Sequence, residues 1–194
     1  MSASSLPPAP EVAAIDALLP QTQCMRCGYA GCRPYAEALA GGTAALNRCP
    51  PGGARLIGAL AAHLGRAPLP LDPECGAEAP ARLAVVVAAE CTGCARCLPA
   101  CPVDAIVGAR RMLHTVLAAW CTGCELCLAA CPVDCIRMIE RPAGDAAAPP
   151  PDAADNRARF HAHQQRRQDG TVERARLLAE RKRVAPAARG GGPA

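Results

Sequence analysis

The sequence predicts an α+β fold in which short strands and helices surround closely spaced cysteines. The main observation is a cysteine motif that occurs twice, at residues 91–106 and 121–136, with twelve of sixteen positions identical. A β-prone stretch precedes each copy, whereas apolar residues at helical spacing mark the N-terminal third. The 194 residues include 14 cysteines and only 2% aromatic residues, so we expect the cysteines to hold the core together.

Each copy has the spacing C-x2-C-x2-C-x3-C-P, which is a ligand pattern of bacterial iron–sulfur proteins. Three cysteines of one copy can reach three corners of a [4Fe–4S] cube, and the fourth binds the other cube. The motif therefore predicts a bacterial-type two-cluster [4Fe-4S] ferredoxin module with crossed ligands. One predicted ligand set is Cys91, Cys94, Cys97 and Cys131, and the other is Cys101, Cys121, Cys124 and Cys127.

The two copies also predict the secondary structure of this module. A helical turn is expected after each Cys-Pro pair, between two strands. Because neither half can bury a core alone, the repeat predicts two interleaved halves with pseudo-twofold symmetry. Cys135, which aligns with Ala105, is predicted to be a buried thiol rather than a ligand. The expected strands are 83–89, 106–107, 114–119 and 136–139.

A second cysteine pattern lies nearer the N-terminus. It reads C-x2-C-x4-C and is followed, after sixteen intervening residues, by CPPGG. Gly28 and Gly31 supply the backbone freedom that tight turns between ligands require. The pattern predicts a small, mostly helical [4Fe-4S] domain, and a zinc site with four cysteines is the alternative. The predicted ligands are Cys24, Cys27, Cys32 and Cys49, and the expected helices are 11–19, 34–40 and 54–64.

Disulfides and zinc are the alternatives for the repeat. The first residues lack the basic and apolar segments of a signal peptide, so we expect a reducing compartment and metal rather than disulfides. Zinc ligand pairs are usually separated by longer stretches than those of the repeat. The sequence therefore predicts three [4Fe-4S] clusters in all.

These patterns divide the chain into five segments. Cys75 has no partner at ligand spacing and is predicted to be a non-ligand thiol, and His63 is predicted to be a surface or packing residue. The segments are a disordered N-terminus (1–10), an N-terminal [4Fe-4S] domain (11–66), a linker (67–81), a two-cluster [4Fe-4S] ferredoxin domain (82–141) and a basic helical or disordered tail (142–194).

The positive charge of the chain is concentrated in its tail. Residues 151–194 contain ten Lys or Arg and five Asp or Glu, whereas the net charge of the whole chain is +4. The tail is interpreted as a solvated helix that Gly170 divides in two. The functional alternative is that the tail docks on an acidic redox partner. A metal-stabilised nucleic-acid-binding module is a third interpretation.

The cysteine chemistry predicts electron transfer. Iron–sulfur clusters exchange single electrons at potentials set by hydrogen bonds, charge and burial. The sequence contains no dinucleotide fingerprint after a strand, no P-loop and no identifiable catalytic set. We therefore predict an iron–sulfur protein that relays single electrons between redox partners, with no catalytic site of its own.

With these residues in view, the chain resembles the Rnf-B family, the B subunit of the Rnf electron-transport complex. The resemblance covers about 18–140 and rests on LPQTQCMRCGYAGCRPYAEAL, NRCPPGG, LPLDPECG, CTGCARCLPACPVDAIVGA and MLHTVLAAWCTGCELCLAACPVDCI. It implies an N-terminal cluster domain, a two-cluster ferredoxin module and electron relay with a membrane complex that couples electron flow to ion movement. An obligate electron-wiring subunit of an ion-translocating ferredoxin:NAD oxidoreductase complex is therefore the alternative to a soluble carrier.

Members of that family typically begin with a membrane-spanning helix, which has no counterpart here. Only 23 residues precede Cys24, and they include four prolines and two acidic residues. No window of the sequence reaches the ~18 apolar residues of a membrane span. The expected location is the cytoplasm, or the cytoplasmic face of the bacterial inner membrane through contacts with other Rnf-complex subunits.

Overall fold

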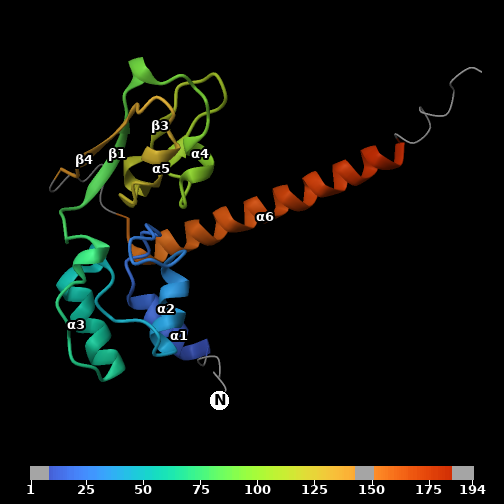
Figure 1. Cartoon of the computed structure of the whole chain (residues 1–194). Helices are drawn as coiled ribbons and strands as arrows, with labels where there is room; N and C mark the ends of the chain where they lie inside the picture. Colours follow the sequence, from blue (N-terminus) through green and yellow to red (C-terminus); the bar gives the residue numbers. More distant parts are fainter. Residues whose placement is uncertain (1–8, 143–150, 185–194) are drawn as a thin grey trace, which may run out of the picture. The chain divides into compact units, whose positions relative to one another are not determined.

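The computed structural model describes residues 9–142 and 151–184. The chain divides between Phe160 and His161 into two compact units, each treated by itself below. The first unit contains a helical N-terminal region and, after it, two small sheets with short helices (Figure 1).

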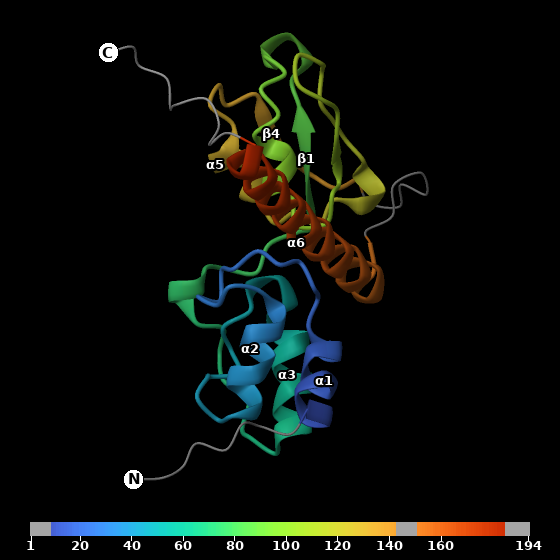
Figure 2. The same cartoon turned by 90° about the vertical axis from the view of Figure 1, so that its right-hand side faces the viewer.

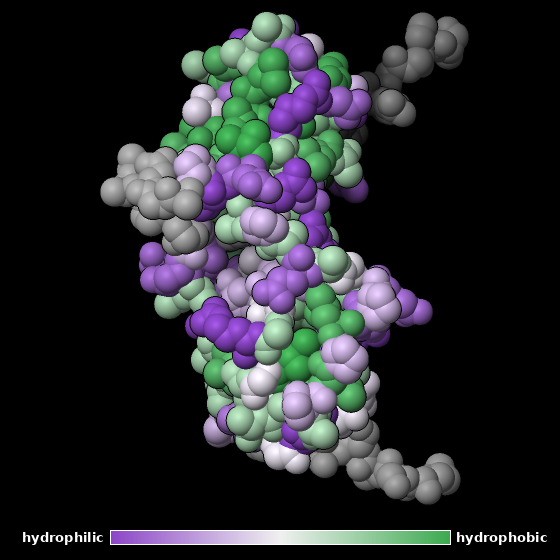
Figure 3. Space-filling view, turned by 90° about the vertical axis from the view of Figure 1, so that its left-hand side faces the viewer, coloured by the Kyte–Doolittle hydropathy of each residue, from purple (hydrophilic) through white to green (hydrophobic). Residues whose placement is uncertain are grey.

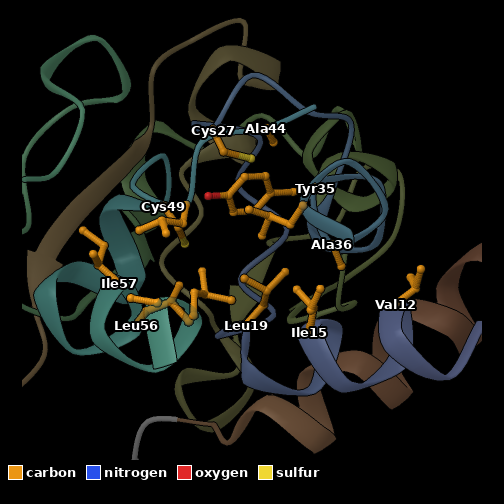
Figure 4. Close-up of a cluster of buried hydrophobic side chains, with 14 residues drawn as sticks. Val12, Ile15, Leu19, Cys27, Tyr35, Ala36, Ala44, Cys49, Leu56 and Ile57 are labelled. Atoms are coloured by element: carbon orange, nitrogen blue, oxygen red, sulfur yellow. The ribbon is translucent and has the colours of Figure 1, made fainter. Parts of the chain in front are cut away.

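Three helices form the N-terminal region: α1 (Ala9–Leu18), α2 (Cys32–Ala40) and α3 (Gly53–Leu64) (Figure 2). Their shared core includes Ile15, Leu39 and Leu60, whose side chains are fully buried. Figure 4 shows Leu19, Tyr35 and Leu56 converging on the same core. The first helix, expected over 11–19, ends at Leu18, which is exposed, whereas Leu19 just beyond the helix is buried.

The predicted linker is bonded to this helical region. The Asn47 side chain donates to the Pro70 carbonyl at 2.6 Å, and Arg48 forms an ion pair with Asp72 at 2.8 Å. A short 3-10 helix, η2 (Pro73–Cys75), follows. These contacts hold the first half of residues 67–81 against the N-terminal domain.

Two antiparallel strand pairs form the sheets of the second region. β1 (Arg82–Val86) pairs with β4 (Ile136–Glu140), and β2 (Ile106–Val107) pairs with β3 (Thr115–Val116). The first strand of one copy thus pairs with the last strand of the other in both sheets. The predicted interleaving of the two copies is confirmed at the level of strand pairing.

The predicted positions of the helical turns are wrong. The short helices α4 (Cys97–Ala100) and α5 (Leu126–Ala130) lie before the fourth cysteine of each copy, not after the Cys-Pro pair. After that pair, Asp104 and Asp134 adopt φ angles of 50° and 49°. Left-handed residues interrupt a right-handed helix, so the chain leaves each cysteine in a tight turn.

The last element is α6 (Ala153–Val184), a single helix through Gly170. The expected division at Gly170 is therefore wrong; a single glycine in a helix costs only about 1 kcal/mol relative to alanine. Within the first unit, the start of α6 is anchored: the Arg159 guanidinium lies 3.5 Å from the centre of the Trp120 ring. Most of the predicted disordered segments, 1–8, 143–150 and 185–194, lie outside the described residues.

No helix in the described ranges has the length and apolar character needed to cross a membrane. On the face drawn in Figure 3, hydrophobic and hydrophilic residues are interspersed. Exposed apolar side chains of the second region include Val107, Met112, Leu113 and Val133.

Candidate metal centres

The first cavity of the sheet region is lined by five cysteines from both copies of the repeat. Four of them form one predicted ligand set: three cysteines of the first copy and the fourth cysteine of the second. His114 and Cys135 also line this cavity. We call it the first-copy cavity, and its four predicted ligands are Cys91, Cys94, Cys97 and Cys131.

The second cavity has the complementary composition. Three cysteines of the second copy and the fourth cysteine of the first line it. Among the described residues no histidine lines this cavity, and its other walls are mostly apolar, with Val103, Ile106 and Val116 among them. We call it the second-copy cavity, and its predicted ligands are Cys101, Cys121, Cys124 and Cys127.

The fourth cysteine of each copy lines the cavity of the other copy, because each copy ends on a strand that pairs with the other copy. Cys101 follows α4 and precedes β2, and β2 pairs with β3 immediately before the second copy. Pro102 follows Cys101 and restricts the backbone at the turn, since proline has a fixed φ and no N–H group. The same order recurs at Cys131.

Backbone N–H groups point at the sulfurs of the second-copy cavity. The Ala84 N–H donates to Cys121 Sγ at 3.4 Å, and the Ala105 N–H donates to Cys101 Sγ at 3.1 Å. Burial nevertheless raises the pKa of Cys124 to about 11 and that of Cys127 to about 12. These thiols therefore keep their protons at neutral pH, and metal binding would have to displace those protons.

The first-copy cavity favours the thiolate form of two of its cysteines. The backbone N–H of His114 is the main cause that lowers the pKa of Cys91. Burial alone would raise the pKa of Cys131, but hydrogen bonds from the Val133 backbone and the Cys135 side chain lower it. Burial raises the pKa of Cys97.

The four N-terminal cysteines are close enough to interact electrostatically. Burial is the largest influence on Cys49 and raises its pKa to about 12. The charges of Cys24, Cys27 and Cys32 each raise this pKa as well. Burial likewise raises the pKa of Cys32 to about 12. The other three predicted N-terminal ligands thus lie within electrostatic range of Cys49.

Glycines shape the loop that carries three of these cysteines. Gly28 and Gly31 have φ angles of 85° and 150°. Glycine adopts such positive angles readily, so both residues supply the backbone freedom that was predicted for them. A Cβ atom at Gly31 would lie 2.9 Å from Gln23 Oε1. That oxygen accepts the Cys32 N–H at 3.0 Å, so the loop and the glutamine fit only without a side chain at residue 31.

A buried polar chain supports the same loop, and sequence reasoning missed it. Gln23 donates to Gln21 at 2.8 Å, and Gln21 donates to the Asp16 carboxylate at 2.9 Å. The Arg157 guanidinium completes the chain, 2.8 Å from the other Asp16 oxygen. The available signal was the run PQTQC: two glutamines in a loop between an apolar helix and the first cysteine.

Arg48 is a second supporting residue that the sequence did not single out. Its Nε donates to the Cys27 carbonyl at 3.1 Å while the same guanidinium pairs with Asp72. Cys75 is buried nearby, as a thiol whose pKa is raised by burial. His63 contacts Glu11 at 3.2 Å on the surface of the helices, which agrees with its predicted packing role.

The N-terminal loop also contacts the loop of the second-copy cavity. The Thr122 hydroxyl donates to the Thr22 carbonyl at 3.1 Å, next to Cys121 and near Cys24. Arg26 and Arg82 both pair with Glu125, at 2.7 and 3.2 Å. These contacts bring the N-terminal cysteine loop beside one repeat loop.

The arrangement of the thiols suits an iron–sulfur cube. In each half of the sheet region, the four cysteines of one predicted ligand set line one cavity. A cube binds thiolates at its corners, so it requires sulfurs spread around a space rather than gathered at a point.

Comparisons with known proteins agree with this cysteine chemistry. The family described as "4Fe-4S dicluster domain" matches residues 84–138, and the family described as "Putative Fe-S cluster" matches residues 19–51. No solved structure matches the chain.

Curated relatives cover both regions. A protein of Stutzerimonas stutzeri is 64% identical over 126 residues, which are 65% of this chain and 65% of the relative. One of Alkalilimnicola ehrlichii is 61% identical over 64% of this chain and 68% of the relative. One of Hahella chejuensis is 59% identical over 70% of this chain and 68% of the relative.

All three relatives are named as the B subunit of an ion-translocating oxidoreductase complex. The match spans about two thirds of their length, and slightly less for the Stutzerimonas protein. At this identity and coverage, the chain belongs to the Rnf-B family, the B subunits of ion-translocating oxidoreductase complexes.

Proposed function

We propose that this chain carries three [4Fe-4S] clusters and relays single electrons between redox partners. The observation that carries the proposal is the pair of cavities, each lined by four predicted ligand cysteines drawn from both copies of the repeat. The third cluster is proposed for Cys24, Cys27, Cys32 and Cys49; the first three share one loop, and all three influence the pKa of Cys49.

When bound, each cube supplies one-electron chemistry at a potential that the protein sets. The chain contributes three things to that chemistry. The cysteines hold the cubes, backbone N–H groups such as those of Ala84 and Ala105 point at their sulfurs, and apolar walls limit water. The contact between Thr22 and Thr122 supports a relay between the N-terminal cluster and the cluster of the second-copy cavity.

The partners that we propose are the other subunits of an ion-translocating oxidoreductase complex. The relatives are named as subunits of such a complex, and the exposed apolar and charged side chains offer surfaces for contact. In this proposal the chain docks on the cytoplasmic face of the bacterial inner membrane. A lone carrier in the cytoplasm is the alternative.

Metal analysis of the full chain, purified without oxygen, tests the cluster proposal. Three cubes require about twelve iron and about twelve acid-labile sulfide atoms per chain. Zinc in place of iron would overturn the proposal, and about eight iron atoms would leave only two cubes. Membrane fractionation then separates a bound subunit from a free carrier.

A further inference from the structure

The two cavities of the sheet region differ at two positions that the repeat relates to each other. With an offset of thirty residues, His114 corresponds to Ala84 and Cys135 corresponds to Ala105. The histidine and the cysteine both line the first-copy cavity, and the two alanines occupy the equivalent places beside the second-copy cavity. Both polar side chains therefore lie at the first-copy cavity, and their counterparts at the second-copy cavity are alanines.

The His114 ring points at two predicted ligands. Its Nδ1 lies 3.7 Å from Cys91 Sγ and 3.6 Å from Cys97 Sγ, and the residue is only 3% exposed. A sulfur bound to iron carries no proton and can only accept, so Nδ1 must carry the hydrogen. The other tautomer would direct a lone pair at both sulfurs and leave a buried Nε2–H; within the described chain, no group accepts from Nε2.

The space for this ring depends on a glycine. Gly108 has a φ angle of 144°, and a Cβ atom there would collide with Cδ2 of His114. The equivalent residue in the other copy is Met138. The backbone of the first copy is therefore shaped to admit an imidazole beside its cysteines.

Cys135 presents a second donor to the same cavity. Its Sγ lies 3.4 Å from Cys131 Sγ, and both residues line the first-copy cavity. Because the ligand sulfurs can only accept once they bind iron, the Cys135 S–H must donate. Cys94 adds a third asymmetry, since it is exposed whereas its counterpart Cys124 is partly buried.

We propose that His114 and Cys135 tune the cluster of the first-copy cavity to a more positive reduction potential than its twin. The inference rests on the proposed function. Reduction adds negative charge to the cluster and its sulfurs, so donors aimed at those sulfurs stabilise the reduced form. Solvent exposure at Cys94 acts in the same direction. An electron shared by the two clusters then resides mainly in the first-copy cavity.

An EPR-monitored redox titration of the full, cluster-loaded chain tests the proposal. We expect His114→Ala to make the more positive of the two ferredoxin-type clusters harder to reduce by about tenfold, which is about 59 mV for a one-electron couple. Cys135→Ala should cause a smaller change, about threefold, because a thiol is a weak donor. His114→Asn, which keeps an N–H near the position of Nδ1, should restore most of the potential.

Two further measurements separate tuning from structural damage. Chains labelled with ¹⁵N-histidine should show a weak nitrogen coupling to one reduced cluster by pulsed EPR, absent in His114→Ala. The matched swap, Cys135→Ala with Ala105→Cys, should narrow the gap between the two potentials.

The iron content of each variant distinguishes the possible failures. Fewer than two cubes in the wild-type repeat would overturn the proposed function itself. Full iron content with unchanged potentials in His114→Ala would overturn the tuning proposal alone.

Discussion

The two halves of the repeat present the same ligands to differently built cavities. In the second-copy half, backbone N–H groups point at two sulfurs, and burial raises the pKa of Cys101, Cys124 and Cys127, although the Thr122 side chain acts to lower that of Cys124. In the first-copy half, the side chains of His114 and Cys135 lie at the sulfurs, and Cys91 and Cys131 have lowered pKa values. A duplicated ligand motif therefore does not make two equivalent sites, because the residues behind the sulfurs differ.

The crossed ligands offer the largest test of that difference. We expect Cys101→Ala to lower the iron content from about twelve to about eight atoms, because Ala105 beside it offers no thiol. Cys131→Ala should lose less iron, because the Cys135 sulfur lies 3.4 Å from that of Cys131 and can replace it as a ligand. Iron and sulfide analysis after anaerobic purification measures both variants.

The double variant Cys131→Ala with Cys135→Ala is the control for this prediction, and it should match Cys101→Ala. Equal losses in Cys101→Ala and Cys131→Ala would show that Cys135 cannot act as a replacement.

A substitution at Gly108 should remove the asymmetry without touching a ligand or a donor. Gly108→Ala would push the His114 ring away from Cys91 and Cys97, and it would strain a backbone with a φ angle of 144°. We expect the first-copy cluster to become severalfold harder to reduce, as in His114→Ala, together with a lower melting temperature. The matched control is Met138→Ala, at the equivalent place in the other copy, which should leave that potential unchanged.

If Gly108→Ala lowers the melting temperature and leaves both potentials at their wild-type values, the position of the imidazole does not set the potential.

Cluster assembly should depend on pH differently in the two halves. Thiolates, not thiols, bind iron, so a thiol with a pKa of about 11 or 12 loses about tenfold of its thiolate for each unit by which the pH falls below that value. Between pH 9 and pH 7, the thiolate fraction of Cys124 and Cys127 should therefore fall about tenfold for each pH unit. The thiolate fraction of Cys91 and Cys131 should fall less over the same range, because their lowered pKa values leave them already partly ionised near pH 9.

Stopped-flow reconstitution of the unloaded chain, followed by EPR of each cluster, measures this difference. The same pH dependence in both halves would contradict it.

The smallest effect is expected at the ion pair next to the second-copy loop. Glu125 pairs with Arg26 and Arg82, but these side chains are partly exposed. Exposed pairs contribute about 0–1 kcal/mol, so Glu125→Gln should lower the melting temperature by at most a few degrees. Thermal unfolding of the loaded chain at low and at 1 M salt measures it; a loss that salt does not diminish would mean that Glu125 acts by something other than its charge.

Much of the ligand arrangement could be predicted from spacing alone. Each predicted set, crossing at Cys101 and Cys131, lines one cavity, and Cys135 joins the first set there, because the number of residues between cysteines limits which sulfurs can share a space. That these cysteines bind the clusters stays a prediction. That iron–sulfur cubes occupy the cavities, and that there are three, stay predictions. The helices of the N-terminal region were also predictable, since their apolar residues recur at helical spacing.

Local conformation was less predictable. The helical turns were placed on the wrong side of Cys101 and Cys131, because nothing in the pattern indicates the left-handed conformation of the following aspartates. Gly170 gave a false helix break, since one glycine costs less than the residues around it contribute.

The cysteine pattern of this protein can be read from the sequence alone, because ligand type and spacing are properties of the chain. The side chains that lie behind the sulfurs follow from the fold. His114 lies seventeen residues beyond Cys97, and Cys135 reads as a small apolar residue in the repeat; strand pairing brings both to one cavity. Gln21, Gln23 and Arg157 likewise support the N-terminal loop through contacts that span up to 141 residues. Such groups act through distance and direction, and these arise only when the chain folds.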